Sequence, residues 1–149
     1  METIDQAKEA QVWERVRGQQ MPDDPREGLQ ELIARELEIS SVCLQLSRRF
    51  SGKQSAQLRQ LYEKELAHSA CLKGIYTLIT GQRPHIRGHI AAGGLVEAEL
   101  RRCYGKQMQN LAQFERRSNH PEYGHIFQSL AIQEREHCHL LLEVLGSLK

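Results

Sequence analysis

Four stretches of this chain carry apolar residues at alternating three- and four-residue steps, and a polar side chain interrupts each apolar stripe near its middle. The stripes of the first half are Leu29, Leu32, Glu36, Ile39, Cys43, Leu46 and Phe50, and Leu58, Leu61, Glu65, His68, Leu72, Ile75 and Ile79. Those of the second half are Val96, Leu100, Cys103, Gln107, Asn110 and Phe114, and Phe127, Leu130, Glu134, His137, Leu141 and Val144. Such stepping is typical of helices that bury one face, so it predicts four amphipathic helices.

Capping residues and turns separate the four stripes. A proline after an N-cap residue marks the start of a helix, and a glycine marks its end. These signals predict helices from the cap at 24–27 to about Phe50, from a capping box at 51–54 to Gly81, from about Leu95 to Ser118, and from a cap at 119–122 to near Gly146.

The segment between the second and third predicted helices, residues 81–94, contains four glycines and one proline. It is too long for a tight hairpin. When extended it reaches ~46 Å, against ~40 Å for a helix of about 27 residues. It can therefore run the length of a bundle and make the second and third helices parallel. We expect an all-α fold, with residues 25–149 forming a four-helix bundle that contains this crossover.

Residues 1–24 are expected to form a separate unit, with a short helix over 3–17 and a linker. The helix carries Ile4, Val12, Trp13 and Val16, so it has an apolar side that needs a cover. Two packing partners for this apolar side are possible. The helix either docks on the end of the bundle or reaches a partner subunit, which would make a homodimer.

Composition excludes several classes of protein. The chain has 149 residues and a formal net charge of +1, which argues against a dedicated nucleic-acid binder. No apolar run approaches the ~20 residues of a membrane span, and the charged N-terminus is unlike a signal peptide. No two cysteines are spaced as C-x-x-C, so we expect four free, buried thiols in the cytoplasm. They are Cys43, Cys71, Cys103 and Cys138.

The central polar residues of the four stripes fall at the same height. At 1.5 Å per residue, each helix places its central Glu or Gln ~17–22 Å from the turn that joins it to the next or preceding helix of its hairpin, within about one helical turn of mid-bundle. Unpaired, each buried ionisable group would cost several kcal/mol. A pair of metal ions would be a common partner for the five ionisable groups, and a hydrogen-bonded polar network is the alternative. The central residues are Glu36, Glu65, His68, Gln107, Glu134 and His137.

The pattern Glu-x-x-His occurs twice in phase with a stripe, at 65–68 and at 134–137. Residues three apart face the same way on a helix, so each pair presents one carboxylate and one imidazole to the same point. A third copy at 136–139 lies about 200° around the helix, on the polar face, and is not expected to take part. Two copies centred on apolar stripes indicate a site between two helical hairpins.

On these residues the chain resembles the ferritin-like di-iron carboxylate proteins, and most of all the rubrerythrin-type members. The resemblance covers residues 25–147 and is carried by LIAREL, YEKELAHSACLKGIYTLITG and LAIQEREHCHLLLEVLG. That family places one glutamate on each of two helices and Glu-x-x-His on each of the other two. It implies a ferritin-like bundle that binds two iron ions and reduces peroxide or dioxygen. The implied ligands are Glu36, Glu65, His68, Glu134 and His137.

The third predicted helix departs from the family pattern, because Gln107 stands where the resemblance implies a glutamate. A neutral amide binds hard cations weakly, so one of the two metal positions is expected to bind less tightly, or a single ion is held. Manganese and zinc are alternatives to iron. The rubredoxin domain of rubrerythrin is absent, so the resemblance implies electrons from a separate redox partner protein or a small reductant.

Two classes of function are therefore open. The first is a di-metal oxidoreductase acting on peroxide or dioxygen. The second is a non-catalytic bundle with a degraded metal site, acting in metal binding or protein assembly, and Gln107 favours it. A thiol role for Cys103 and Cys138, near one end of the site, would instead suit copper or zinc, but a packed core cysteine is the simpler interpretation.

Overall fold

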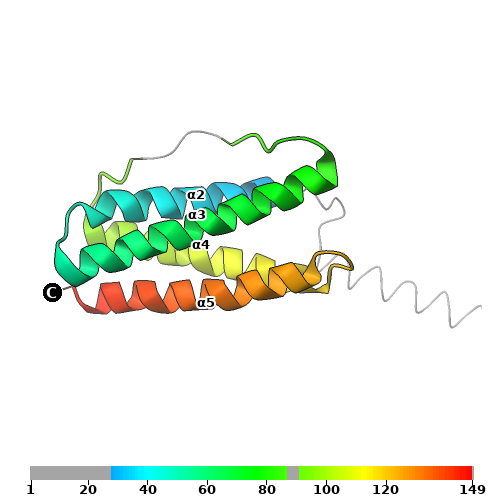
Figure 1. Ribbon diagram of the computed structural model, residues 1–149. Coiled ribbons are helices and arrows are strands. Elements are labelled where there is room, and N and C mark those ends of the chain that lie inside the picture. Colours follow the sequence, from blue (N-terminus) through cyan, green and yellow to red (C-terminus); the bar gives the residue numbers. More distant parts are fainter. Residues whose placement is uncertain (1–27, 87–90, 149) are drawn as a thin grey trace, which may run out of the picture.

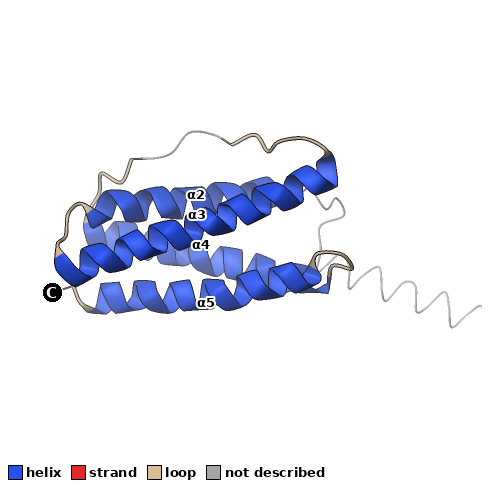
Figure 2. Cartoon of the chain, viewed as in Figure 1, coloured by secondary structure: helices blue, strands red, loops and turns tan. Residues whose placement is uncertain are grey.

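The computed structural model describes residues 28–86 and 91–148, which contain four α-helices and no strand (Figures 1 and 2). The predicted all-α bundle of four helices is confirmed for these residues. The helix predicted over 3–17, and with it the unit 1–24, lies outside the described residues. The elements are α2 (Leu29–Ser47), α3 (Gly52–Thr80), α4 (Val96–Arg116), the 3-10 turn η1 (Arg117–Asn119) and α5 (Gly124–Gly146).

The helices form two antiparallel hairpins, α2 with α3 and α4 with α5. The hairpins pack through α2 against α4 and through α3 against α5. Both α3 and α4 run in the same direction along the bundle, as Figure 1 shows. A simple up-down-up-down order is therefore excluded, and α3 lies diagonally opposite α4.

Hydrogen bonds fix the connection between α3 and α4 at both ends of α2. The backbone N–H of His85 donates to Gln30 Oε1 at 2.7 Å, near the start of α2. The backbone N–H of Ala92 donates to Gln45 Oε1 at 2.9 Å, near the end of α2. The Arg49 guanidinium also donates to the Ala92 carbonyl. The described parts of the connection thus lie at opposite ends of the bundle, which agrees with the predicted crossover.

The core consists of two apolar clusters. One surrounds Phe114 and Phe127, and the other surrounds Leu58 and Leu141. The stripe positions predicted to be buried are buried, apart from partly exposed residues at the ends of stripes. Full burial of each leucine side chain contributes about 1.5–3 kcal/mol. The two clusters flank the level of the polar side chains and keep bulk water away from it.

The first hairpin begins and ends its helices differently from the prediction. α2 begins at Leu29 because Gly28, at φ 83°, has a left-handed backbone that cannot belong to the helix. The caps predicted at 24–27 lie outside the described residues. The helix ends at Ser47 rather than Phe50. α3 begins at Gly52, within the predicted cap at 51–54, but the Ser51 side chain makes no capping hydrogen bond, so the predicted capping box does not form.

The other helix ends follow the prediction more closely. Gly81 ends α3 with φ 71°, and its N–H donates to the Thr77 carbonyl at 2.8 Å. α5 begins at Gly124, later than the predicted cap at 119–122, because His120 caps this turn. The His120 Nδ1 accepts hydrogen bonds from the backbone N–H groups of Glu122 and Tyr123, each at 3.1 Å.

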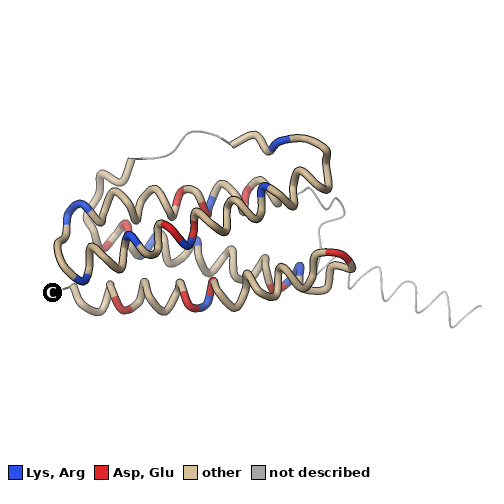
Figure 3. Tube along the Cα trace, viewed as in Figure 1, with Lys and Arg blue, Asp and Glu red and all other residues tan. Residues whose placement is uncertain are grey.

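Charged residues of both signs occur along every helix, and Figure 3 shows no stretch of a single sign dominating the bundle. Surface pairs include Lys106 with Glu38 and Arg135 with Glu115. The second of these pairs is exposed, and an exposed pair contributes about 0–1 kcal/mol. Across the described part of the chain, no helix is both long enough and apolar enough to span a bilayer.

Candidate metal centre

All six side chains singled out in the sequence are buried at one level of the bundle. Each of the four helices supplies at least one of them, because each stripe turns its middle inward. Two other glutamates of α4 take no part in the group: Glu115 pairs with Arg135 at the surface, and the buried Glu99 pairs with Arg102. The six are Glu36 on α2, Glu65 and His68 on α3, Gln107 on α4, and Glu134 and His137 on α5.

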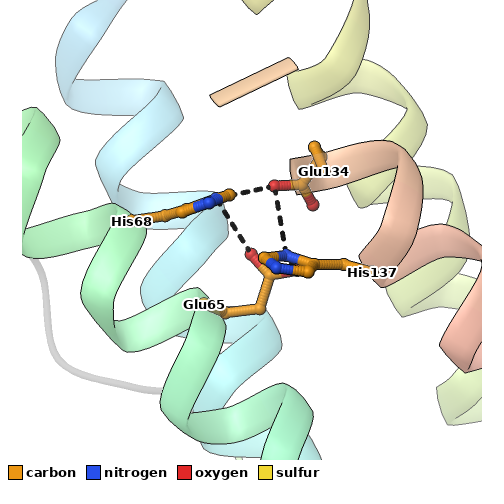
Figure 4. A group of neighbouring side chains, drawn as sticks. All are labelled: Glu65, His68, Glu134 and His137. Carbon is orange, nitrogen blue, oxygen red and sulfur yellow. Dashed lines mark hydrogen bonds and ion pairs between the residues drawn. The ribbon is translucent and has the colours of Figure 1, made fainter. Parts of the chain in front are cut away.

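Four of these side chains form the centre of the group, shown in Figure 4. One ligand atom from each of Glu65, His68, Glu134 and His137 lies within 4.8 Å of the other three. The pairing crosses between hairpins. His68 Nδ1 lies 3.0 Å from Glu134 Oε2, and His137 Nδ1 lies 3.0 Å from Glu65 Oε1. The site therefore exists only where the two hairpins meet.

Glu36 stands at one side of this group. Its Oε2 lies 4.0 Å from His68 Nδ1. Its other oxygen, Oε1, accepts a hydrogen bond from Asn110 Nδ2 at 2.9 Å. Glu36 thus adds a third buried carboxylate on the His68 side.

Several oxygens in the cluster have no hydrogen-bond donor although they are buried. They are Glu36 Oε2, Glu65 Oε2, Gln107 Oε1 and Glu134 Oε1. A buried polar group without a partner costs about 1–3 kcal/mol, and more when it is charged. Carboxylate oxygens and imidazole nitrogens are the ligands that iron, manganese and zinc take in proteins. The donor set therefore fits a divalent transition-metal ion.

Two amides of α4 hold the carboxylates. Gln107 Nε2 donates to Glu65 Oε1 at 3.0 Å, while Asn110 Nδ2 donates to Glu36 Oε1. In turn, Arg35 Nε donates to Asn110 Oδ1 at 2.6 Å. Each amide occupies one oxygen of its carboxylate and leaves the other, Oε2, without a partner. No role was predicted for Asn110, although its place three residues after Gln107 on the same stripe was the available signal.

Gln133 orients His68 from the outer side. His68 Nε2 lies 2.8 Å from Gln133 Oε1. Because a carbonyl oxygen only accepts, Nε2 carries the proton of the neutral imidazole, and the proton between Nδ1 and Glu134 Oε2 then belongs to the Glu134 carboxyl group, whose pKa is raised. This is the tautomer that binds a metal through Nδ1. Nothing in the sequence marked Gln133, which is an exposed residue next to Glu134.

Burial and mutual charge shift the pKa values of the cluster. Burial, reinforced by the charge of Glu65, raises the pKa of Glu134 well above its usual range. Burial lowers the pKa of His68. It also acts to lower that of His137, but contacts with Glu134 and Glu65 outweigh it and raise the pKa to about 9. Glu134 and His137 thus hold protons more tightly than an exposed glutamate or histidine.

The cysteines are all free thiols, and none belongs to the group of ligand atoms just described. Cys43, Cys103 and Cys138 are buried as predicted, whereas Cys71 is exposed. Cys71 directly precedes Leu72, about 100° around α3 from the buried face. Burial, with the charges of Glu134 and Glu65, raises the pKa of Cys138 to about 12, so it stays a thiol rather than a metal-binding thiolate.

The third Glu-x-x-His copy lies on the surface, since both Glu136 and His139 are exposed. The prediction that it takes no part in the cluster is therefore confirmed.

Comparison of the chain with models of protein families, with curated proteins and with solved structures gave no match. The function is therefore inferred from the geometry of the buried cluster.

Proposed function

We propose that this protein is a metal-dependent oxidoreductase of the ferritin-like, rubrerythrin-type class, which reduces peroxide or dioxygen. One observation carries the proposal. Three buried carboxylates from three helices each present an oxygen without a hydrogen-bond donor beside two imidazoles. A structural polar network would satisfy its own atoms, because orphaned buried charges are costly.

Glu36, Glu65, His68, Glu134 and His137 would hold the metal, with Gln107 beside them. A bound redox-active ion such as iron supplies the electrons for reduction of the oxidant. The chain's own part is to position the ion and to exclude water. In the metal-free chain burial raises the pKa of Glu134, so this carboxyl group gives up a proton when it takes up an ion.

Iron fits the donor set and the proposed redox chemistry, and manganese or zinc fits the donors alone. The sequence has no C-x-x-C pair for a built-in electron carrier. We therefore propose that electrons arrive from a separate redox partner protein or a small reductant. The free thiols are in keeping with a reducing compartment, for which we propose the cytoplasm.

The test is metal content and peroxide consumption of the full chain produced with iron. The matched pair of variants is Glu134→Gln and Glu136→Gln, which make the same change two residues apart on α5, one buried and one exposed. We expect iron and turnover to be lost in Glu134→Gln and retained in Glu136→Gln. Iron-free protein after reconstitution, or equal turnover in both variants, would contradict the proposal.

The second candidate is a non-catalytic bundle that binds metal or takes part in protein assembly. The observation that favours it is Gln107, a neutral amide whose Nε2 donates to Glu65. Under this alternative, the reconstituted protein binds metal but consumes neither peroxide nor dioxygen when a reductant is supplied. The same preparation of iron-loaded protein distinguishes the two functions.

A further inference from the structure

The two imidazoles of the cluster have unequal surroundings. His68 Nδ1 has oxygens of three carboxylates around it: Glu134 Oε2 at 3.0 Å, and Glu36 Oε2 and Glu65 Oε2 at 4.0 Å each. His137 Nδ1 has oxygens of only two, Glu65 Oε1 at 3.0 Å and Glu134 Oε2 at 3.8 Å. The His68 end therefore offers one more negative charge to a cation.

Gln107 is the reason for this difference. Gln107 takes the place on α4 that Glu36 takes on α2. It lies on the side of His137, the imidazole with fewer carboxylates around it. Its Nε2 donates to Glu65 Oε1, the same oxygen that approaches His137. A cation at this end would have to compete with that hydrogen bond for Glu65 Oε1. Its only added ligand would be the neutral amide oxygen Gln107 Oε1.

The hydrogen bonds at the other end leave the ligand atoms open. Asn110 binds Glu36 through Oε1, so that Glu36 Oε2 has no donor. Glu65 Oε2 also lacks a donor. Gln133, on Nε2 of His68, leaves the Nδ1 of that ring facing the three carboxylates. Three carboxylates thus each place an oxygen within 4.0 Å of one imidazole nitrogen.

Resting on the metal-binding function proposed above, we infer that the centre holds one divalent ion tightly, at the His68 end between Glu36, Glu65 and Glu134. The His137 end binds a second ion at least about 100-fold more weakly. Loss of a residue that only hydrogen-bonds a ligand already costs about 10–100-fold in affinity, and here a charged ligand itself is missing. With only the tight position filled, the centre is mononuclear. Gln107 is the residue that sets the number of ions.

The test is an anaerobic titration of the full-length, metal-free protein with Mn²⁺. Bound ions are counted by equilibrium dialysis, and electron paramagnetic resonance distinguishes an isolated Mn²⁺ from a spin-coupled pair. We expect one tight equivalent with the spectrum of an isolated ion. Two equivalents of similar affinity with a coupled spectrum would overturn the inference and leave the metal-binding function standing. Absence of any binding would overturn both.

Variants locate the ion and test the role of Gln107. Gln107→Glu should add a second tight equivalent and a coupled spectrum, and Gln109→Glu, the same change at an exposed position of α4, should not. His68→Gln should abolish the tight equivalent, while His137→Gln should retain it. Equal losses in the two histidine variants would contradict the assignment to the His68 end. Circular dichroism of each variant checks its fold, and the wild-type titration decides the number of ions even if a variant fails to fold.

Discussion

Asn110 on α4 donates a hydrogen bond from Nδ2 to Oε1 of Glu36 on α2, at 2.9 Å and out of contact with water. The bond crosses from one hairpin to the other. It fixes the direction of Glu36, since only Oε2 is then left to face His68. A residue that would not itself contact the ion thus determines how one of the carboxylates is presented.

The first prediction concerns this bond. Asn110→Leu, a change of similar volume, should lower the free energy of unfolding by about 1–3 kcal/mol, because Glu36 loses its donor in a buried place. It should also weaken metal binding by about 10–100-fold. Urea denaturation and a Mn²⁺ titration measure the two effects. Gln109→Leu, an exposed change on the same helix, is the control. Unchanged metal affinity in Asn110→Leu would contradict the role of this hydrogen bond in presenting Glu36.

The second prediction concerns the metal-free protein and pH. The pKa of Glu134 is raised in the fold by burial and the Glu65 charge, above its ordinary value of 4.5. A group with a raised folded pKa contributes stability at low pH and loses it as pH rises through that pKa. Glu134→Gln cannot ionise, so its free energy of unfolding should exceed that of wild type more at about pH 8 than at about pH 5.

Denaturant unfolding of both metal-free proteins across this range measures the difference. Glu136→Gln, at an exposed position, should show no such pH-dependent gain. A constant or shrinking gain of Glu134→Gln with rising pH would contradict the raised pKa of Glu134.

The third prediction links metal and protons. In the metal-free protein the pKa of His137 is about 9, and that of Glu134 is raised as well. Both groups must lose a proton before they bind a cation. Apparent metal affinity should therefore rise with pH, and any share of it that needs His137 should level off above about pH 9. Calorimetric titrations in two buffers with different heats of ionisation count the released protons. Binding without proton release at neutral pH would contradict this prediction.

The fourth prediction concerns the thiols. Cys71 is exposed, whereas the other three cysteines are buried. A thiol-specific reagent should modify one residue of the native protein quickly and the rest only on unfolding. A hydrogen bond with the Cys103 thiol, together with burial, raises the pKa of Cys43 and slows its reaction further. Cys71→Ser should remove the fast phase. A fast phase that persists in this variant would show that the buried helix faces open readily.

The periodicity of the chain predicted the fold and located the cluster, because both depend on which residues share a helix face. Glu65 and His68 are three residues apart on an apolar stripe, so burial of the stripe turned both inward. The same rule gave Gln107 its inward position on α4. Periodicity also predicted that Glu136 would lie outside.

Periodicity does not predict which side chains of different helices contact each other. Gln133 is exposed by its position on α5, yet its amide reaches His68 on α3. Arg35 reaches Asn110 across the seam between hairpins. At Ser51 the start of the helix was predicted correctly, but the capping hydrogen bond of its side chain does not form. Such features depend on three-dimensional neighbours that no spacing encodes.

The division of the donors between the hairpins has a consequence for assembly. Glu36, Glu65 and His68 come from one hairpin, and Gln107, Glu134 and His137 from the other. The connection between α3 and α4 joins the two halves covalently and makes their docking intramolecular. A chain cut within that connection would become a pair of complementary fragments. Metal would then act as a cross-link between them, and the strength of their reassociation would report its binding without any need for catalysis.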